Sequence, residues 1–562
     1  MKKIIKNSTQ IVVSAIMMAF SFSAAAYDFM VDSICYNVIG ENEVEVTKRD
    51  VKYTGEIMIP STVSHDGINY QVTQIGFQAF NNCSGLTLIG IPEGVTAINS
   101  YAFSSCGNLE DVDFPNSLIS IGNYAFQDCS SFSNVYIPRN VAVIAYNAFS
   151  FCHTIKSYSC SSLNPYFRAV DGVLFSKDMT KLVAYPQAAL ASSYDVPSTV
   201  TAIDFHAFRD CDNLVNITIP ETVTWLGSTV FARCDNLVSL YLPDGITHMG
   251  VGIFSGCTNL SNLHLPASLD SIMNGSFSHC MSLSELTIPR NVSYIDQYAF
   301  YESGGIKHIY FEEDSRLAYI GSSAFASSDG LETFYMPNSV TTTGNSIFYK
   351  CPSLKNVSIS QNLSVLEVSS YNYCTSLIEL YIPSNVTLVG NSSVANCSSL
   401  KRLTIGEKDA TSSTTIPNCG VISNNQLERL ELGANVDSLS EYAINELGNL
   451  KVLICWAQNP PKLNHYSFNP IPSRINAPLY VRRASLEAYR TTQHWMDFKT
   501  ILAIEDVGDV NGDGAISIAD VSALIDFLLD GEISTLLADV NLDGDITIAD
   551  VAALIDVLLG GD

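Results

Sequence analysis

Two short acidic segments near the end of the chain have the residue types and spacing of a cation-binding loop. They read DVNGDGAISIAD (509–520) and DVNLDGDITIAD (539–550). In both, oxygen-bearing side chains stand at loop positions 1, 3, 5, 9 and 12, and a glycine at position 6 (Gly514, Gly544) allows a sharp turn. This is the spacing of an EF-hand loop, whose hard oxygen ligands suit Ca²⁺.

We therefore predict two Ca²⁺ ions, one in each loop. Position 7 would offer its backbone carbonyl, position 9 would act through a water molecule, and position 12 would close the loop. Position 12 is Asp in both loops, where the common EF-hand has Glu. The predicted ligands are Asp509, Asn511, Asp513, Ala515, Ser517 and Asp520 in the first loop, and Asp539, Asn541, Asp543, Asp545, Thr547 and Asp550 in the second.

The charge of the chain is negative and unevenly distributed. The 562 residues carry a formal net charge of −27, and residues 505–562 hold 14 Asp and Glu but no Lys or Arg. Phosphates would be repelled over most of such a surface, which argues against nucleic acid as a partner. With 47% hydrophobic and 15% charged residues, the composition is that of a folded chain and not of a disordered one.

The long part of the chain that precedes these loops is built from a 23-residue repeat. QAFNNC, YAFSSC, YAFQDC and NAFSFC end at Cys83, Cys106, Cys129 and Cys152. A typical repeat reads L-x-x-I-x-I-P-x-x-V-x-x-I-x-x-x-A-F-x-x-C. The I-x-I piece predicts a short strand that the following Pro ends, and we expect irregular or 3₁₀-like turns in the remainder. One repeat cannot bury its own apolar face, so stacked repeats predict a solenoid.

The cysteines follow the same period. Most of the 15 recur at one position of the repeat, which places them in an inward-pointing ladder. Ser303 replaces one of them, and the next repeat has Ser327 and Ser328. A disulfide partner would not tolerate this exchange, whereas a small buried residue would. We therefore predict reduced, buried cysteines, and disulfides remain the alternative for an exported chain.

The repeat pattern xxAFxxCxxLxxIxIPxxVxxI resembles the BspA-like leucine-rich repeats of bacterial surface and secreted proteins. The resemblance covers roughly residues 55–470. It implies a curved right-handed solenoid with a parallel sheet on its concave face and an irregular convex side. The resemblance also implies a role in adhesion and binding, not in catalysis.

The two acidic loops, with Asp at position 12 and one apolar helix after each, resemble a type I dockerin. That resemblance implies two Ca²⁺ ions, a small all-α domain with a pseudo-two-fold pair of helices, and docking onto a cohesin-like partner. Many members carry Ser-Thr at loop positions 10 and 11, where this chain has Ile518-Ala519 and Ile548-Ala549. These four residues are the candidate docking positions. Their departure from the family pattern leaves open whether the partner is a cohesin-like domain or another envelope protein.

The chain as a whole divides into five segments. The start has the charge and apolar run of a cleavable signal peptide, so we expect export to the outside or the surface of the cell. No later stretch is long and apolar enough to span a membrane. The predicted segments are a signal peptide (1–26), a β-rich N-terminal cap (27–70), the repeats with a hairpin insertion at about 160–190 (71–475), a C-terminal cap (476–504) and the dockerin (505–562).

Outward-facing positions of the repeat strands form a candidate surface for a protein or glycan ligand. Exposed Tyr beside polar residues suits such contacts, although Tyr also simply favours strands. The candidate residues are Tyr136, Tyr241, His264, Tyr310, Tyr335 and Tyr381.

Catalytic motifs are missing from the sequence. The nine His are scattered, and no G-x-S-x-G, H-E-x-x-H or P-loop occurs. We therefore predict a secreted, non-enzymatic binding protein without catalytic residues. The alternative is an accessory or enzymatic component of a polysaccharide-degrading assembly, because dockerins commonly accompany glycan-degrading enzymes.

Overall fold

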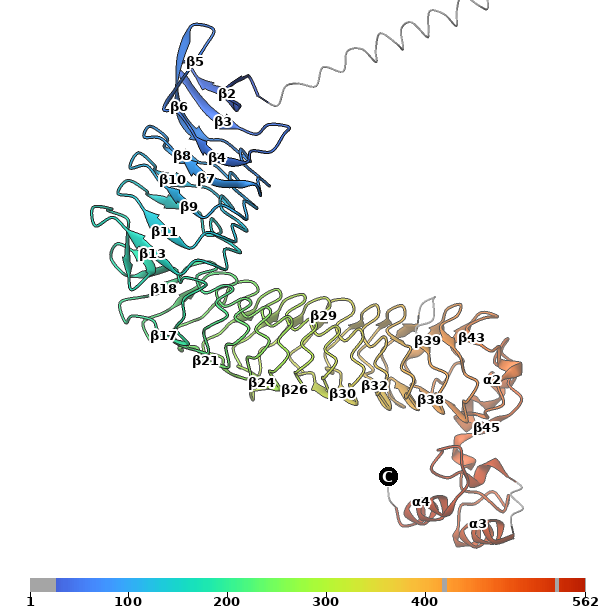
Figure 1. The fold of residues 1–562 in the computed structure, drawn as a ribbon. Coiled ribbons are helices and arrows are strands. Elements are labelled where there is room, and N and C mark those ends of the chain that lie inside the picture. Colours follow the sequence, from blue (N-terminus) through green and yellow to red (C-terminus); the bar gives the residue numbers. More distant parts are fainter. Residues whose placement is uncertain (1–26, 417–421, 531–534, 561–562) are drawn as a thin grey trace, which may run out of the picture. The chain divides into compact units, whose positions relative to one another are not determined.

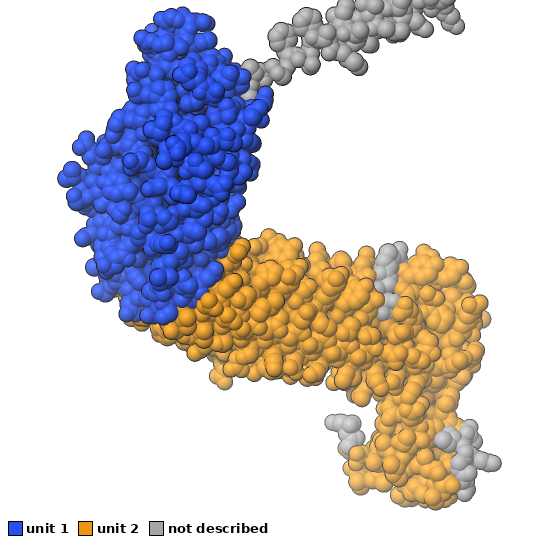
Figure 2. Space-filling view, in the orientation of Figure 1, with its two compact units in different colours: residues 1–214 blue, residues 215–562 orange. Residues whose placement is uncertain are grey.

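The computed structural model describes residues 27–416, 422–530 and 535–560. The predicted signal peptide lies outside these residues. The chain forms two compact units, residues 1–214 and 215–562 (Figure 2). No helix in the described ranges is long and apolar enough to cross a bilayer.

Both units are built from stacked turns of parallel β-solenoid (Figure 1). The strands of the first unit are β1 (Phe29–Val31), β2 (Ile34–Gly40), β3 (Glu43–Thr47), β4 (Gly55–Met58), β5 (Thr62–His65), β6 (Ile68–Ile75), β7 (Leu86–Gly90), β8 (Ala97–Ile98), β9 (Asp111–Asp113), β10 (Ser120–Ile121), β11 (Asn134–Ile137), β12 (Val143–Ile144), β13 (Ser157–Cys160), β14 (Phe167–Val170), β15 (Val173–Ser176), β16 (Lys181–Ala184), β17 (Ser193–Asp195) and β18 (Ala202–Ile203).

The second unit continues the same pattern and ends in a helical region. Its strands are β19 (Asn216–Thr218), β20 (Trp225–Leu226), β21 (Ser239–Tyr241), β22 (Asn262–His264), β23 (Ser271–Ile272), β24 (Glu285–Ile288), β25 (Tyr294–Ile295), β26 (His308–Phe311), β27 (Tyr319–Ile320), β28 (Thr333–Tyr335), β29 (Thr342–Thr343), β30 (Asn356–Ser358), β31 (Val365–Leu366), β32 (Glu379–Ile382), β33 (Leu388–Val389), β34 (Val394–Ala395), β35 (Arg402–Ile405), β36 (Thr414–Ile416), β37 (Ile422–Ser423), β38 (Arg429–Leu432), β39 (Val436–Leu439), β40 (Ile444–Asn445), β41 (Val452–Cys455), β42 (Lys462–Leu463), β43 (Phe468–Asn469), β44 (Leu479–Val481) and β45 (Ile501–Ala503). Its helices are α2 (Leu486–Thr491), α3 (Ile518–Asp530) and α4 (Ile548–Leu558), and 3₁₀ segments occupy Pro472–Arg474, Arg483–Ser485, Ile504–Asp506 and Leu536–Ala538.

Most repeats contribute to two parallel ladders, and the last repeats add a third, β34–β37–β40–β43. The I-x-I strand pairs with its counterpart one repeat later, as β24 does with β26 and β26 with β28. A second ladder, which the sequence pattern did not predict, joins two-residue strands such as β23, β25, β27 and β29. In Figure 1 the longer strands β24, β26 and β30 lie along one edge of the second unit and the short strand β29 along the other.

The remaining segment of each repeat is a run of tight turns, which explains why no helix forms there. Two residues per turn take the left-handed conformation, such as Tyr101 (φ 58°) and Ser105 (φ 59°). These residues break any helical run. The Phe103 N–H between them donates to the Ala125 carbonyl of the next repeat at 2.7 Å. The turns are therefore tied to their neighbours by backbone hydrogen bonds. The described 3₁₀ segments begin only at Pro472, near the end of the repeats.

Over much of the solenoid the core is a stack of aromatic rings with one ring for each repeat, whereas later repeats have aliphatic residues such as Val394 and Ile444 at this position. Phe254, Phe277, Phe300 and Phe325 are fully buried, and the centroids of successive rings lie 5.6, 5.0 and 4.9 Å apart. Offset-stacked rings at this spacing attract one another beyond the burial of their area. The 23-residue period therefore places a large apolar side chain at the same depth in every turn of the solenoid.

The cysteine ladder lies beside these rings and has its own hydrogen bonds. The fourteen described cysteines are free, and all but Cys160 are buried. Cys419 lies outside the described residues. The Sγ of Cys351 donates to the carbonyl of Phe325 at 3.1 Å, and Cys106, Cys129 and Cys257 make the same bond to a Phe 26 residues earlier. Ser303 and Ser328 donate to the equivalent carbonyls, so serine substitutes because it keeps the donor.

We expect the ladder thiols to be unreactive in the native protein. Burial raises the pKa of Cys280 and of Cys351 to about 12, so neither is a thiolate at neutral pH. A thiol reagent at pH 8 should label few cysteines in the folded protein and nearly all after denaturation without reductant. The loss of six or seven pairs of titratable thiols in the denatured, unreduced sample would contradict the reduced ladder.

The N-terminal strands and the insertion at about 160–190 contain antiparallel pairs. Strands β14, β15 and β16 form two consecutive hairpins, and Asp171 and Gly172 make the first turn with positive φ. At the N-terminus β1, β2 and β3 are antiparallel. However, β4 already pairs in parallel with β7, so the strand ladder begins before the expected boundary at residue 71.

The last turns of the solenoid are closed by the segment around α2. Strands β44 and β45 extend the parallel ladder beyond β41. Trp495 is fully buried, and its Nε1 donates to the Pro461 carbonyl at 2.8 Å. Trp495 and Phe498 both pack edge-on against Phe468, which covers the end of the ring stack.

Candidate functional site

The two acidic loops lie in a small domain with its own core. Each loop leads directly into a helix, α3 or α4, and the two helices pack against each other. The apolar residues after each loop supply this core, as their helical spacing predicts. The buried members after the loops are Val521, Leu524, Val551 and Leu554, and Val510 of the first loop and Ala538 before the second loop join them.

The aspartate at position 12 organises each loop from the inside. Asp520 is fully buried, and its Oδ1 accepts the backbone N–H groups of Val510 and Asn511 at 2.8 and 3.0 Å. Its Oδ2 accepts the N–H of Ser517 at 2.8 Å. Burial acts to raise the pKa of Asp520, but these hydrogen bonds outweigh it and lower the pKa overall. Asp550 is equally buried and bonds Asn541 and Thr547 in the same way.

The aspartate at position 1 is buried in both loops, and in the first loop one of its carboxylate oxygens has no partner. Oδ2 of Asp509 accepts the Gly514 N–H at 2.9 Å, whereas its buried Oδ1 has no hydrogen-bond partner. Burial raises the pKa of Asp539 to about 6, and the charges of Asp550 and Asp543 add to the effect. An orphaned buried carboxylate oxygen is costly unless a cation or a donor meets it.

The residues present fit a Ca²⁺ ion. Among the described residues, no group of three or more His, Cys, Asp or Glu side chains forms a metal site without other ligands. An EF-hand set, however, also draws on Asn oxygens and backbone carbonyls, which these loops supply. Gly514 (φ 86°) and Gly544 (φ 88°) at position 6 take the left-handed conformation that the sharp turn requires.

The hydroxyl at position 9 has a structural role besides the one predicted for it. Thr547 Oγ1 accepts the N–H of Ala549 at 3.1 Å and caps α4. Ser517 Oγ does the same for Ala519 at the start of α3, at 3.2 Å. Capping of this kind stabilises a helix by about 1 kcal/mol. The loop and the helix that follows it are therefore built as one element.

The four candidate docking residues lie on the surface of this domain. Ile518 is 72% exposed and Ile548 is 74% exposed, and Ala519 and Ala549 beside them are also exposed. Each pair starts its helix, α3 or α4, directly after the capping hydroxyl. Two exposed isoleucines at matched positions are a surface that a partner could bury.

The second candidate surface is the outward side of the long strand ladder, called here the exposed sheet face. Tyr241, Tyr310, Tyr335 and Tyr381 are exposed on this face in the second unit, with Tyr310 at 48% and Tyr335 at 58%. In the first unit Tyr136 is exposed on strand β11. His264 is also exposed, and its ring stacks on that of Tyr241 at 4.7 Å with a 2° interplanar angle. The Tyr381 hydroxyl donates to Glu407 at 2.7 Å.

Two open grooves follow this face in the second unit. Tyr310, Tyr335, Glu312 and Asn338 line one of about 560 Å³. The other, of about 360 Å³, lies along Tyr241, His264 and the neighbouring Asn and Ser residues. Both have the size of ordinary ligand sites, about 300–1,000 Å³. The sequence analysis missed Glu312 and Asn338 because they belong to the turns after the strands, whereas only the outward positions of the strands were considered.

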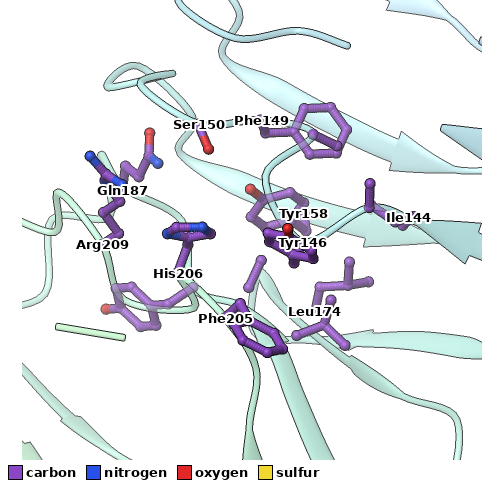
Figure 3. A pocket seen from close by; sticks show the side chains of 15 residues that line it. Ile144, Tyr146, Phe149, Ser150, Tyr158, Leu174, Gln187, Phe205, His206 and Arg209 are labelled. Carbon is purple, nitrogen blue, oxygen red and sulfur yellow. The ribbon is translucent and has the colours of Figure 1, made fainter. Parts of the chain in front are cut away.

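A more enclosed pocket in the first unit is too small for a ligand. It lies beside the hairpin insertion, has a volume of about 40 Å³, and is lined by Tyr146, Tyr158, Gln187, His206 and Arg209, among others (Figure 3). That volume accommodates a few water molecules. Burial lowers the pKa of His206 to about 4, and the nearby Arg209 charge lowers it further. The pocket is therefore not a candidate binding site.

Comparison with known proteins agrees with this architecture. Residues 62–169, 184–307 and 294–419 match the BspA type leucine rich repeat region, in six copies. These matches cover more than half of the chain. The chain belongs to the BspA-type leucine-rich repeat proteins. Residues 507–559 match the type I dockerin domain, so its BspA-type solenoid is followed by a dockerin. Type I dockerins bind calcium and dock onto cohesin partners.

Solved structures similar to this BspA-type protein include bacterial leucine-rich repeat proteins. One from Bacteroides ovatus is 23% identical, with 70% of this chain and 95% of that chain covered and a TM-score of 0.42. Another from Eubacterium ventriosum is 22% identical, with 64% and 92% covered and a TM-score of 0.40. No curated protein sequence matches the chain.

Proposed function

We propose that this protein is an exported, non-enzymatic binding protein of the bacterial surface or its surroundings. Its exposed sheet face binds a protein or glycan ligand, and its dockerin, loaded with two Ca²⁺ ions, tethers it to a cohesin-like partner. The leucine-rich repeat solenoid and the dockerin support a binding component anchored through cohesin. The predicted signal peptide at 1–26 supplies the route of export.

The observation that carries the ligand surface is the exposed row of aromatic and polar side chains over open grooves. Tyrosine exposes a flat apolar ring and a hydroxyl at low cost in conformational entropy. Tyr310 and Tyr335 stand on adjacent parallel strands, with Glu312 and Asn338 in the same groove. Such a groove offers ring faces for stacking and acceptors for ligand hydroxyl or amide groups.

The double variant Tyr310→Ala/Tyr335→Ala tests this surface. We expect at least a tenfold loss of affinity for the ligand found on an array of polysaccharides and extracellular proteins. The unfolding midpoint should change little, because outward side chains carry little core energy. The matched control is Tyr294→Ala/Tyr319→Ala, a tyrosine pair of adjoining repeats whose rings stack at 5.0 Å on the second ladder instead. Equal loss in both variants, or in neither, would place the ligand elsewhere.

The rival function, an enzymatic component of a polysaccharide-degrading assembly, requires a measurable turnover. The intact protein should release no reducing sugar from the polysaccharides that it binds. Hydrolysis that survives the Tyr310→Ala/Tyr335→Ala change would favour the rival and would identify a catalytic site away from the grooves.

A further inference from the structure

The exposed sheet face changes from polar to apolar at the last repeats. Outward positions earlier in the ladder are polar, such as Tyr381 and Thr404. In β41 the corresponding side chains are Val452 and Ile454, which are fully buried, and Tyr480 of β44 follows them. A strand that is buried on both faces has lost the alternation of a half-exposed one. Something must therefore cover this end of the ladder.

The cover is the second acidic loop of the dockerin. Leu542 is only 8% exposed and packs in one apolar cluster with Val452, Ile454 and Tyr480. Ile504 and Val507, which connect β45 to the first loop, pack against the same cluster. The connection between solenoid and dockerin is thus short and part of the contact.

Polar contacts surround this apolar centre. Nη1 of Arg429 donates to the backbone carbonyls of Asn541 and Leu542 at 3.1 and 2.9 Å. The Lys451 ammonium pairs with Asp545 at 2.6 Å. The Tyr480 hydroxyl donates to the Leu536 carbonyl at 3.1 Å. The acidic segment from residue 505 onward, which has no Lys or Arg of its own, is therefore met by the basic residues Arg429 and Lys451 of the solenoid.

The two loops differ at the positions that touch the solenoid. At position 4 the first loop has Gly512 (φ 76°), whereas the second has Leu542 in the same left-handed region (φ 53°). A leucine is strained there, so its presence needs a compensating contact. At position 6 a Cβ on Gly544 would meet Lys451 at 2.3 Å, whereas one on Gly514 would meet nothing within 4 Å.

We propose that the second acidic loop is a docking element for the chain's own solenoid. Leu542 provides the apolar contact, and Arg429 and Lys451 provide the polar contacts around it. These contacts hold the dockerin rigidly against the last repeats. The exposed Ile518 and Ile548 stay free for the partner. Asn541 and Asp545 are predicted Ca²⁺ ligands at positions 3 and 7, so a bound ion would fix the loop in the shape that the solenoid receives.

The test uses the full chain in Ca²⁺ with Leu542→Gly, which gives the second loop the residue of the first. In this variant we expect a glutamate-specific protease, cutting after Glu505, to release residues 506–562 at least ten times faster than from the wild type. X-ray scattering should also give a larger maximum dimension for the variant. Leu559→Gly, the same change at the 81% exposed residue directly after the end of α4, should behave like the wild type. If Leu542 served only the loop, Leu542→Gly would stabilise the dockerin, because glycine removes the backbone strain of a leucine at positive φ.

A second variant changes only the solenoid side. Arg429→Ala/Lys451→Ala should speed the release of residues 506–562 in the same way while Ca²⁺ binding, measured by calorimetry, keeps its stoichiometry. Its control is Lys355→Ala, which removes a comparable ion pair between neighbouring repeats, 3.1 Å to Glu332. Release at the wild-type rate in both variants overturns the proposal. Faster release in Leu542→Gly alone, together with lost Ca²⁺ binding, would also overturn it, since Leu542 would then serve the loop.

Discussion

Removing calcium is expected to unfold the dockerin while the solenoid stays folded. The loops bury four carboxylates, Asp509, Asp520, Asp539 and Asp550, in a segment without any basic residue. A bound Ca²⁺ offsets their repulsion, and because the unfolded chain holds no site, binding energy becomes folding energy. At a free concentration 100 times Kd, one site contributes about 2.7 kcal/mol. Circular dichroism and calorimetry of the full chain, with Ca²⁺ or with chelator, measure this loss.

Single ligand changes separate the two loops. Asp539→Ala and Asp509→Ala each remove the position-1 ligand, and each should lower the stoichiometry of Ca²⁺ binding from two to one. The control Asp556→Ala, an exposed carboxylate of α4 outside the loops, should keep both sites. A helical signal that is equally strong in excess chelator would contradict metal-dependent folding. Loss of both sites in either variant would show instead that the loops fold as one unit.

Truncating one ring of the aromatic stack is expected to be the most destabilising single change in the solenoid. Phe300 is fully buried between Phe277 and Phe325, and its removal leaves a cavity between two fixed neighbours. Phe300→Ala should lower the free energy of unfolding by about 3–5 kcal/mol. Urea denaturation followed by far-ultraviolet circular dichroism gives the change.

The control for this variant lies in the same repeat. Tyr310→Ala removes an aromatic ring of similar size from the exposed sheet face, and it should cost much less than Phe300→Ala. Similar losses in the two variants would mean that the exposed face, and not the ring stack, carries the stability. In a solenoid each repeat contacts mainly its neighbours, so Phe300→Ala should also loosen hydrogen exchange first around residues 277–325.

Much of the fold follows from period and residue type. A Phe every 23 residues requires equivalent positions in stacked turns, because rings at one depth can be buried only by their counterparts in the neighbouring repeats. The I-x-I alternation likewise predicted which tyrosines are exposed. The second ladder of two-residue strands was missed, because so short a segment has no periodicity to detect.

For the calcium loops the sequence predicts ligands residue by residue, because all the candidate ligands of a loop lie within twelve consecutive positions. The sequence by itself therefore determined the stacked repeat, the thiol ladder and the loop spacing. Tertiary structure alone decided where the dockerin lies, because Arg429 and Leu542 are 113 residues apart and meet only after folding. Two traces of that contact are present in the sequence, the unbroken apolar run VLIC and the Leu in place of Gly. Neither feature can be interpreted until the two segments are known to face each other. Burial between distant segments leaves no periodic pattern in either one.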